Sequence, residues 1–213
     1  MKICGITRLE DAQAAVDAGA SAIGFVFAAS PRRVEVAQAA AIRASLPGDV
    51  GVIGVFVDGG VDEVLSAAEG AQLDGVQLQG AQGEAEVAAI RAGRPGLFIT
   101  RAVRLTGPSD VAQATAIAVD AVMVDSKDAH HPTEQHGQIP VGWLTGIGPT
   151  RLIVAGGLGP STVGAVVSSL RPWGVDVSSG VEVSPGRKDP ALIRQFLRAV
   201  REAELVANEA GVG

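Results

Sequence analysis

Residues 2–27, KICGITRLEDAQAAVDAGASAIGFVF, contain the sequence signals of a strand, a helix and a second strand in that order. Residues 2–4 and 22–27 are short runs of β-branched and apolar residues, as in buried strands. Between them, residues 9–18 have the apolar spacing of a helix and are followed by Gly19, a common helix C-cap. The stretch therefore predicts one β-strand, α-helix, β-strand unit.

The same alternation continues along the chain. Further apolar runs, each bounded by glycine or polar residues, lie at residues 52–57, 75–78, 97–100, 121–124, 152–155 and 175–177. The starts of the runs are roughly 20 to 30 residues apart, which is typical of strand–helix units in an all-parallel sheet. Eight such units predict an α/β fold, a (β/α)8 TIM barrel in which residues 1–213 form a single domain. An open doubly wound sheet is the alternative, but no Gly-x-Gly-x-x-Gly follows the first strand.

Length and composition limit the classes of function. The chain has 213 residues, near the lower size for one such barrel. No apolar run approaches the roughly 18 to 20 residues of a membrane-spanning helix, and no secretory signal is present, so we expect a cytoplasmic protein. A formal net charge of −6 without a block of Lys or Arg argues against nucleic acid or a membrane as partner. The single cysteine, Cys4, excludes an internal disulfide and a cysteine-ligated zinc or iron–sulfur cluster.

Barrel enzymes carry their active sites on the loops that follow the C-terminal ends of the strands. The residues expected at this rim are Cys4, Arg32, Gln77, Asp125, Gly156, Gly157, Ser178, Ser179 and Gly180. Glycines let backbone N–H groups approach an anion, so the loops after the seventh and eighth strands predict a phosphate site. The alternative is that these glycines only form turns and caps.

Each of the other candidates also has a purely structural interpretation. Asp125 could cap the next segment, and Cys4 could be a small buried hydrophobe. Arg32 could be a solvated loop charge, although a guanidinium suits a carboxylate ligand. The three histidines lie within residues 130–136, where a solvated loop is favoured over a metal site.

Several motifs resemble those of the phosphoribosylanthranilate isomerase family. They are KICGIT at 2–7 with Asp11-Ala12, GFVF at 24–27, SPR at 30–32, GVF at 54–56, VQL at 76–78, AGGL at 155–158, and DVSSGVE at 176–182 with Pro185-Gly186 and Lys188-Asp189. The motifs span nearly the whole chain and coincide with the strand ends chosen above.

The resemblance implies an Amadori rearrangement of N-(5-phosphoribosyl)anthranilate to 1-(2-carboxyphenylamino)-1-deoxyribulose 5-phosphate in tryptophan biosynthesis, with no redox cofactor and no metal. Asp125 matches the family's acid, which protonates the furanose ring oxygen, and Cys4 matches its base, which takes the C2 proton. The acid must hold a proton near neutral pH, which a rim position shielded by substrate would favour. The thiolate of Cys4 needs positive charge or a helix N-terminus nearby to lower the thiol pKa from about 8.5. Lys2 is expected to point the opposite way along the strand and to be a poor source of that charge.

The resemblance also implies which residues bind the substrate. Arg32 matches the contact to the anthranilate carboxylate. The phosphate loops are matched by Gly156, Gly157, Ser178 and Ser179, and the matching motifs also contain Gln77, Asp176 and Gly180. The implied partner is a phosphorylated small molecule, and the protein is expected to be a monomer or a homodimer.

The chain departs from the family's pattern at two places. The family usually has Gln-Leu-His-Gly after the fourth strand, whereas here Gln79 replaces the histidine and cannot titrate, so we expect it to tune the site. After Asp125 the family has a Gly-Gly-Thr-Gly-like loop and an Asp-Trp pair, of which only Gly137 and Trp143 are matched. The resemblance therefore implies nothing specific about loop closure and substrate affinity.

Three other functions are weighed against this one. An isomerase of the histidine pathway, or an aminoaldose isomerase with a broader range that includes the histidine-pathway substrate, would have aspartates at the ends of strands one and five, where this chain has Cys4 and Arg101-Ala102. Indole-glycerol-phosphate synthase would need lysines and glutamates at several strand ends. A catalytically silent phosphate-binding barrel would lack Cys4 or Asp125, and both are present.

Overall fold

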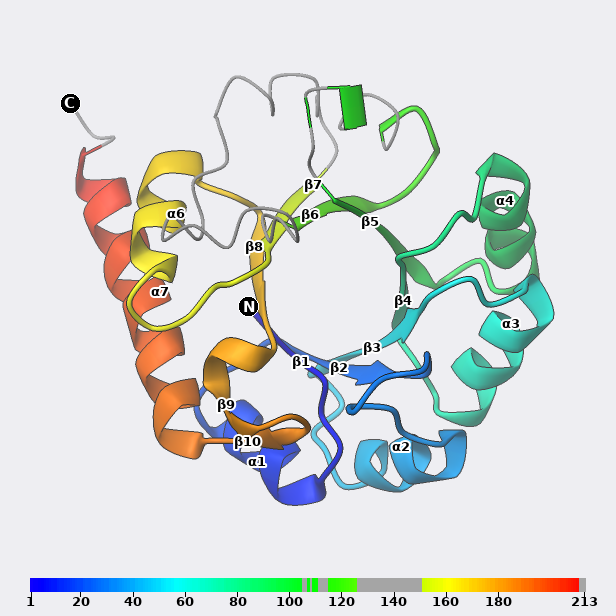
Figure 1. Cartoon of the computed structure of the whole chain (residues 1–213), viewed down its shortest axis with the longest axis horizontal. Coiled ribbons are helices and arrows are strands. Elements are labelled where there is room, and N and C mark those ends of the chain that lie inside the picture. The colour runs from blue at the N-terminus through cyan, green and yellow to red at the C-terminus, as the bar shows by residue number, and fades with distance from the viewer. Residues whose placement is uncertain (105–106, 108, 111–114, 126–150, 211–213) are drawn as a thin grey trace.

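A computed structural model describes residues 1–104, 107, 109–110, 115–125 and 151–210. Eight parallel strands form a closed barrel in which each strand pairs with the next along the chain and the eighth with the first (Figure 1). The strands are β1 (Lys2–Cys4), β2 (Ala22–Val26), β3 (Gly51–Phe56), β4 (Gly75–Leu78), β5 (Phe98–Arg104), β6 (Ala121–Asp125), β7 (Arg151–Ala155) and β8 (Gly174–Val177). The predicted (β/α)8 barrel is therefore confirmed.

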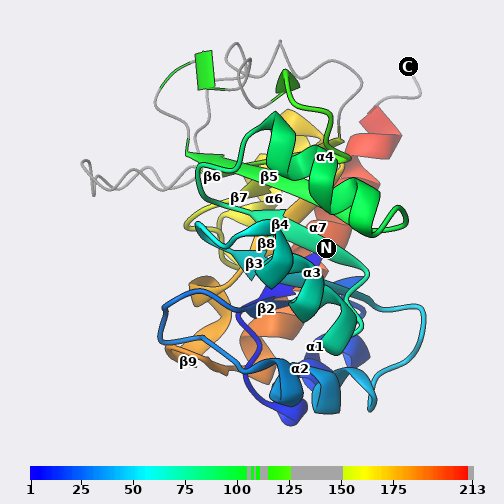
Figure 2. The same ribbon diagram turned by 90° about the vertical axis from the view of Figure 1, so that its right-hand side faces the viewer.

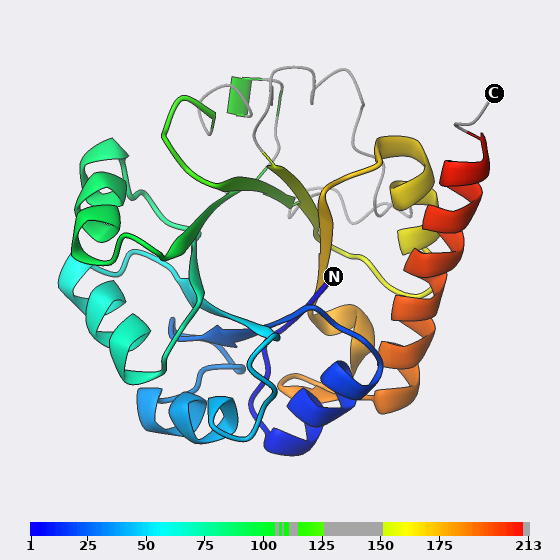
Figure 3. The same ribbon diagram turned by 180° about the vertical axis from the view of Figure 1, so that it is seen from behind.

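Helices surround the barrel, as Figure 1 and the view from behind in Figure 3 show. They are α1 (Leu9–Asp17), α2 (Val36–Arg43), α3 (Val61–Gly70), α4 (Glu84–Gly93), α6 (Val163–Leu170) and α7 (Pro190–Ala210). In the side view of Figure 2, α3 and α4 lie in front of strands that cross the view obliquely. The last helix, α7, packs against both α6 and α1, so the end of the chain covers the seam between β8 and β1. In the described part of the chain, no helix is long and apolar enough to cross a membrane.

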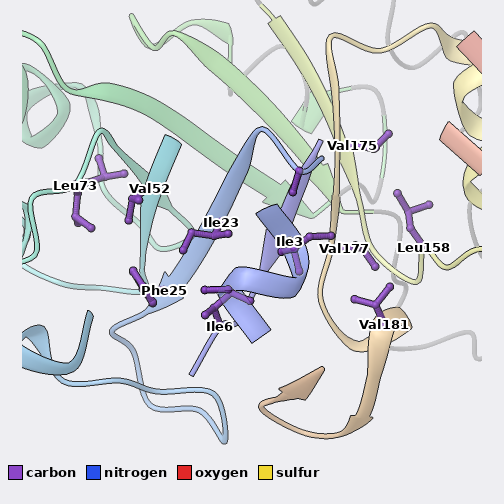
Figure 4. Packing of buried hydrophobic residues seen from close by; sticks show 14 of the residues in the cluster. Ile3, Ile6, Ile23, Phe25, Val52, Leu73, Leu158, Val175, Val177 and Val181 are labelled. Carbon is purple, nitrogen blue, oxygen red and sulfur yellow. The ribbon is translucent and has the colours of Figure 1, made fainter. Parts of the chain in front are cut away.

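The main core lies between the barrel and its helices. Ile3, Ile23 and Phe25 have no exposed surface and pack with Val175 and Val177 of β8 in this layer (Figure 4). Side chains alternate between the two faces of a strand, so the residues on either side of Ile3 face the barrel interior instead. The outer core thus determines which residues of each strand point inward.

Two elements differ from the prediction. The fifth strand is longer than the predicted run 97–100, because Thr100 to Arg104 pair with β6 residue by residue. After β8 the chain forms the 3-10 helix η2 (Ser179–Val181) and a hairpin of β9 (Glu182–Ser184) and β10 (Arg187–Lys188), which was not predicted. In Figure 1 this hairpin lies beside α1. The candidates His130, His131 and His136 and the matched Gly137 and Trp143 lie outside the described residues.

Candidate active site

Strand alternation places the candidate acid on the interior face of β6. Ala121 and Met123 pack in a small cluster inside the barrel, whereas Val122 and Val124 belong to the outer core. Asp125 continues the inward series of residues 121 and 123 and ends the strand. The same alternation places Cys4 on β1, Gln77 on β4 and Asp176 on β8 inside, because their neighbours belong to the outer core.

A cavity of about 360 Å³ opens where these inward side chains meet the loops that follow the strands. Its lining includes nine of the ten residues predicted from the sequence: Cys4, Arg32, Gln77, Asp125, Gly156, Gly157, Asp176, Ser178 and Ser179. Gln79 lines it as well. The volume is that of a pocket for one small organic molecule. The structure therefore brings the candidates from six strands and their loops together at one end of the barrel.

Gly180, the tenth candidate, supports the cavity from behind rather than lining it. A Cβ atom on Gly180 would collide with the carbonyl oxygen of Leu158 and lie 3.1 Å from the Cα atom of Gly159. The loops after β7 and β8 are therefore in direct backbone contact. In the first of them, Gly156 and Gly157 have φ angles of +86° and +64°, which L side chains rarely adopt. The glycines are thus required by the loop geometry, which turns the backbone at the cavity wall.

A second cavity, of about 300 Å³, lies at the other end of the barrel. Met1, Trp173 and Gly174 line it, and they precede or begin strands β1 and β8. Trp173 stacks on Phe98 with ring centroids 5.7 Å apart, and the Arg151 guanidinium lies over both rings. Since barrel sites form at the carboxyl ends of the strands, this cavity is not the candidate active site.

The Cys4 thiol lies in a mostly buried position at the end of β1. Burial raises the pKa of the thiol above its ordinary value, the positive charge of Lys2 opposes that rise, and the Asp176 carboxylate adds to it. The net direction is upward, so the protonated thiol is the main form at neutral pH. The base that the predicted reaction needs is the minor form in the ligand-free protein.

The expectation that Lys2 points away from Cys4 is wrong. Residues two apart in a strand project from the same face, so Lys2 and Cys4 both point into the barrel. The Lys2 Nζ atom lies 2.8 Å from Asp176 Oδ1, in an ion pair whose two side chains are 10% and 9% exposed. A buried cation thus lies beneath the candidate base.

Arg32 is held by a carboxylate of the protein itself. Its Nε and Nη2 atoms donate to Glu182 Oε1 and Oε2 at 2.8 and 2.6 Å. The Nζ of Lys188 donates to the same Oε1 at 2.8 Å and to the Ser178 carbonyl at 3.2 Å. Burial raises the pKa of Glu182, but the hydrogen bonds from Arg32 and Lys188 outweigh burial and lower it to about 2. Two cations around one carboxylate leave a net positive charge at the rim.

Sequence reasoning gave Glu182 and Lys188 no role. Both residues lie within 176–189, a region that carries the family resemblance. Their position directly after the predicted phosphate loop could have identified them as residues of the site. Because Glu182 occupies the Nε–Nη2 edge of Arg32, a ligand carboxylate must approach another edge. The Nη1 group of Arg32 makes no hydrogen bond to any described residue.

Gln77 has one unused acceptor at the cavity. The residue is 1% exposed, and its Oε1 has no hydrogen-bond partner among the described residues. A buried acceptor without a donor is costly, and a ligand hydroxyl would remove that cost. This supports the prediction that Gln77 contacts substrate. Within the described ranges, no cluster of three or more His, Cys, Asp or Glu residues could hold a metal ion.

Comparisons with known proteins agree with the fold. Residues 1–199 match the family described as N-(5'-phosphoribosyl)anthranilate (PRA) isomerase. The N-(5'-phosphoribosyl)anthranilate isomerase of Pelobacter propionicus is 39% identical over 208 residues, which cover 95% of each chain. The crystal structure of phosphoribosyl anthranilate isomerase from Thermotoga maritima superposes with a TM-score of 0.84 at 32% identity and covers 94% of this chain and 98% of that one.

A second similar solved structure, also of a phosphoribosyl anthranilate isomerase, contains a ligand. It is a complex with reduced 1-(o-carboxyphenylamino)-1-deoxyribulose 5-phosphate, with a TM-score of 0.80 at 31% identity, covering 94% of this chain and 97% of that chain. The match of sequence and of fold extends over almost the whole barrel. The chain therefore belongs to the N-(5'-phosphoribosyl)anthranilate isomerase family.

Proposed function

We propose that the cavity at the carboxyl end of the barrel converts N-(5-phosphoribosyl)anthranilate to 1-(2-carboxyphenylamino)-1-deoxyribulose 5-phosphate, with Cys4 as base and Asp125 as acid. The protein is an isomerase of tryptophan biosynthesis. The observation that carries the assignment of roles is that Cys4 and Asp125, from strands β1 and β6, line one cavity together with both glycine-containing loops.

The two residues act on different atoms of the substrate. Asp125 protonates the furanose ring oxygen, the bond between C1 and that oxygen breaks, and the nitrogen lone pair forms a Schiff base at C1. The Cys4 thiolate then removes the proton from C2, which gives an enol that tautomerises to the ketone. The number of atoms and electrons is unchanged, as an isomerisation requires.

The remaining side chains bind the two anionic ends of the substrate. The loops at Gly156–157 and 178–180 bind the phosphate, where glycines allow backbone N–H groups to approach an anion. The Nη1 edge of Arg32 binds the anthranilate carboxylate, since Glu182 already occupies its other edge. Gln77 accepts a hydrogen bond from a sugar hydroxyl, and Asp176 contacts the substrate beside it.

Fluorescence of freshly generated N-(5-phosphoribosyl)anthranilate provides the test. We expect the wild type to consume it, and Cys4→Ser and Asp125→Asn each to lower kcat by at least about a hundredfold, as expected for lost acid–base groups. The histidine-pathway aminoaldose is run in parallel and should not turn over. A wild type that binds the reduced product analogue but consumes no substrate would be a binding barrel, and the assigned roles would then be wrong.

The same proposal includes the organisation of the protein. Residues 1–213 form one catalytic domain that works in the cytoplasm as a monomer or a homodimer. Sedimentation of the purified chain measures which of the two forms is present.

A further inference from the structure

The Cys4 sulfur and the Lys2 ammonium group flank the same small space inside the barrel. A Cβ atom built on Gly24 of β2 would lie 2.8 Å from Cys4 Sγ and 3.2 Å from Lys2 Nζ. The two groups are therefore at most about 6 Å apart, within the range at which opposite charges shift an ionisation. Only glycine at position 24 leaves this space open.

The ammonium group is held in that place. Lys2 pairs with Asp176 across the seam between β1 and β8, and the Nζ–Oδ1 distance is 2.8 Å. A lysine buried without an anion would lose its proton. Here the pKa of Lys2 is raised, because the Asp176 and Cys4 charges outweigh burial, and the lysine stays charged.

We infer that Lys2, anchored by Asp176, is a positioning residue that holds a positive charge beside the Cys4 sulfur and makes the thiolate available as a base. This role in the reaction rests on the proposed function. The effect of the Lys2 charge on the Cys4 thiol is independent of the proposed function, because it is present without substrate.

Other charges also face the thiol. Asp176 on β8 opposes the formation of the thiolate, and Lys188 on β10 favours it with a smaller effect than that of Lys2. Arg32 follows β2 and also interacts with the Cys4 charge, and Asp125 on β6 lines the same cavity. Lys188 and Arg32 are both hydrogen-bonded to Glu182, which partly neutralises them. Lys2 is therefore the cation with the largest effect on the thiol, and its charge can be removed without breaking the hydrogen bonds around Glu182.

The composition of the chain makes the thiolate directly measurable. It contains one cysteine and no tyrosine, so the far-ultraviolet absorbance that appears with rising pH comes from the Cys4 thiolate without a tyrosinate signal. The variant Cys4→Ser serves as the blank. Titration of the ligand-free protein then gives the pKa of the thiol.

Lys2→Met is expected to raise the measured thiol pKa by about 1 to 3 units, the usual effect of one nearby opposite charge. Lys2→Arg keeps the charge and should titrate closer to the wild type than Lys2→Met does. Lys2→Gln, a second neutral replacement, should raise the thiol pKa in the same direction as Lys2→Met. A pKa that is raised in both neutral variants and restored by Lys2→Arg separates a charge effect from a loss of structure, and circular dichroism checks the fold of each variant.

The inference is overturned if Lys2→Met titrates like the wild type, or, should that variant fail to fold, if Lys2→Gln titrates like the wild type. The pH dependence of kcat/KM is measured on the same variants and should shift with the thiol. If the thiol pKa shifts in these variants but the pH dependence of kcat/KM does not, Cys4 is not the base and the proposed function is wrong on that role. The effect of the Lys2 charge on the thiol would still hold.

Discussion

Glu182 holds the two positively charged side chains, Arg32 and Lys188, in place at the rim of the cavity. It accepts hydrogen bonds from Arg32 and from Lys188, and its side chain is 4% exposed. The arrangement keeps the guanidinium in one orientation before any ligand arrives, which reduces the cost of ordering a long side chain on binding. The Arg32 guanidinium is therefore already oriented for the ligand carboxylate that we propose it binds.

The low pKa of Glu182 predicts a loss of stability in acid. Its pKa falls from 4.5 in the unfolded chain to about 2 in the folded protein, so its contribution to stability is complete above pH 4.5 and is lost as the pH falls to about 2. We expect the melting temperature of the wild type to fall more steeply between pH 4.5 and pH 2 than that of Glu182→Gln.

Glu35→Gln is the matched control for that measurement. Glu35 pairs with Arg33 on the surface, where the two side chains are 76% and 54% exposed, and such pairs contribute little. The melting temperature of Glu35→Gln should fall with pH as steeply as that of the wild type. If the melting temperature of Glu182→Gln also falls as steeply as that of the wild type, Arg32 and Lys188 do not lower the pKa of Glu182 in the folded protein.

The loops after β7 and β8 behave as one element, because their backbones touch. Gly180 packs on the Leu158 carbonyl group and on Gly159, neither of which can rotate away as a side chain could. The position of each loop, and with it the wall of the cavity, is thus coupled to that of the other.

Gly180→Ala should therefore displace both loops. We expect it to lower the free energy of unfolding by about 1 to 3 kcal/mol, as overpacking does, and to weaken inhibition by inorganic phosphate. Gly48→Ala is the control, because a Cβ there meets nothing within 4 Å. Urea unfolding and phosphate inhibition are measured for both variants. If Gly180→Ala is destabilised but phosphate inhibits it as strongly as the wild type, these loops do not bind the phosphate.

The barrel as a whole is closed by its first and last elements. The eighth strand pairs with the first, and α7 covers the seam by packing on α1 and α6 (Figures 1 and 3). Phe196 and Ile193 of α7 have no exposed surface and belong to the main core. The ion pair of Lys2 with Asp176 and the position of Cys4 both depend on this closure.

Phe196→Ala should destabilise the whole barrel. A buried phenylalanine truncated to alanine typically costs about 3 to 5 kcal/mol, which would appear as a lower urea midpoint. Leu205→Ala on the same helix is the control, because Leu205 is 64% exposed, and it should change the free energy of unfolding by less than about 0.5 kcal/mol. Equal midpoints for the two variants would mean that α7 does not contribute to the common core.

The amino-acid sequence by itself determined the eight strands, their parallel order and most of the candidate site. Apolar runs and helical spacing are local patterns, and a barrel places every strand end on one rim. Eight of the nine candidates that line the cavity could therefore be placed there from chain position, and the ninth, Asp176, came from the family resemblance. Only the tertiary structure decided which charges meet. Arg32 and Glu182 are 150 residues apart, and Lys2 reaches Asp176 only because β1 pairs with β8. Such ion pairs depend on barrel closure and on the burial of both side chains, and neither is encoded in a local pattern.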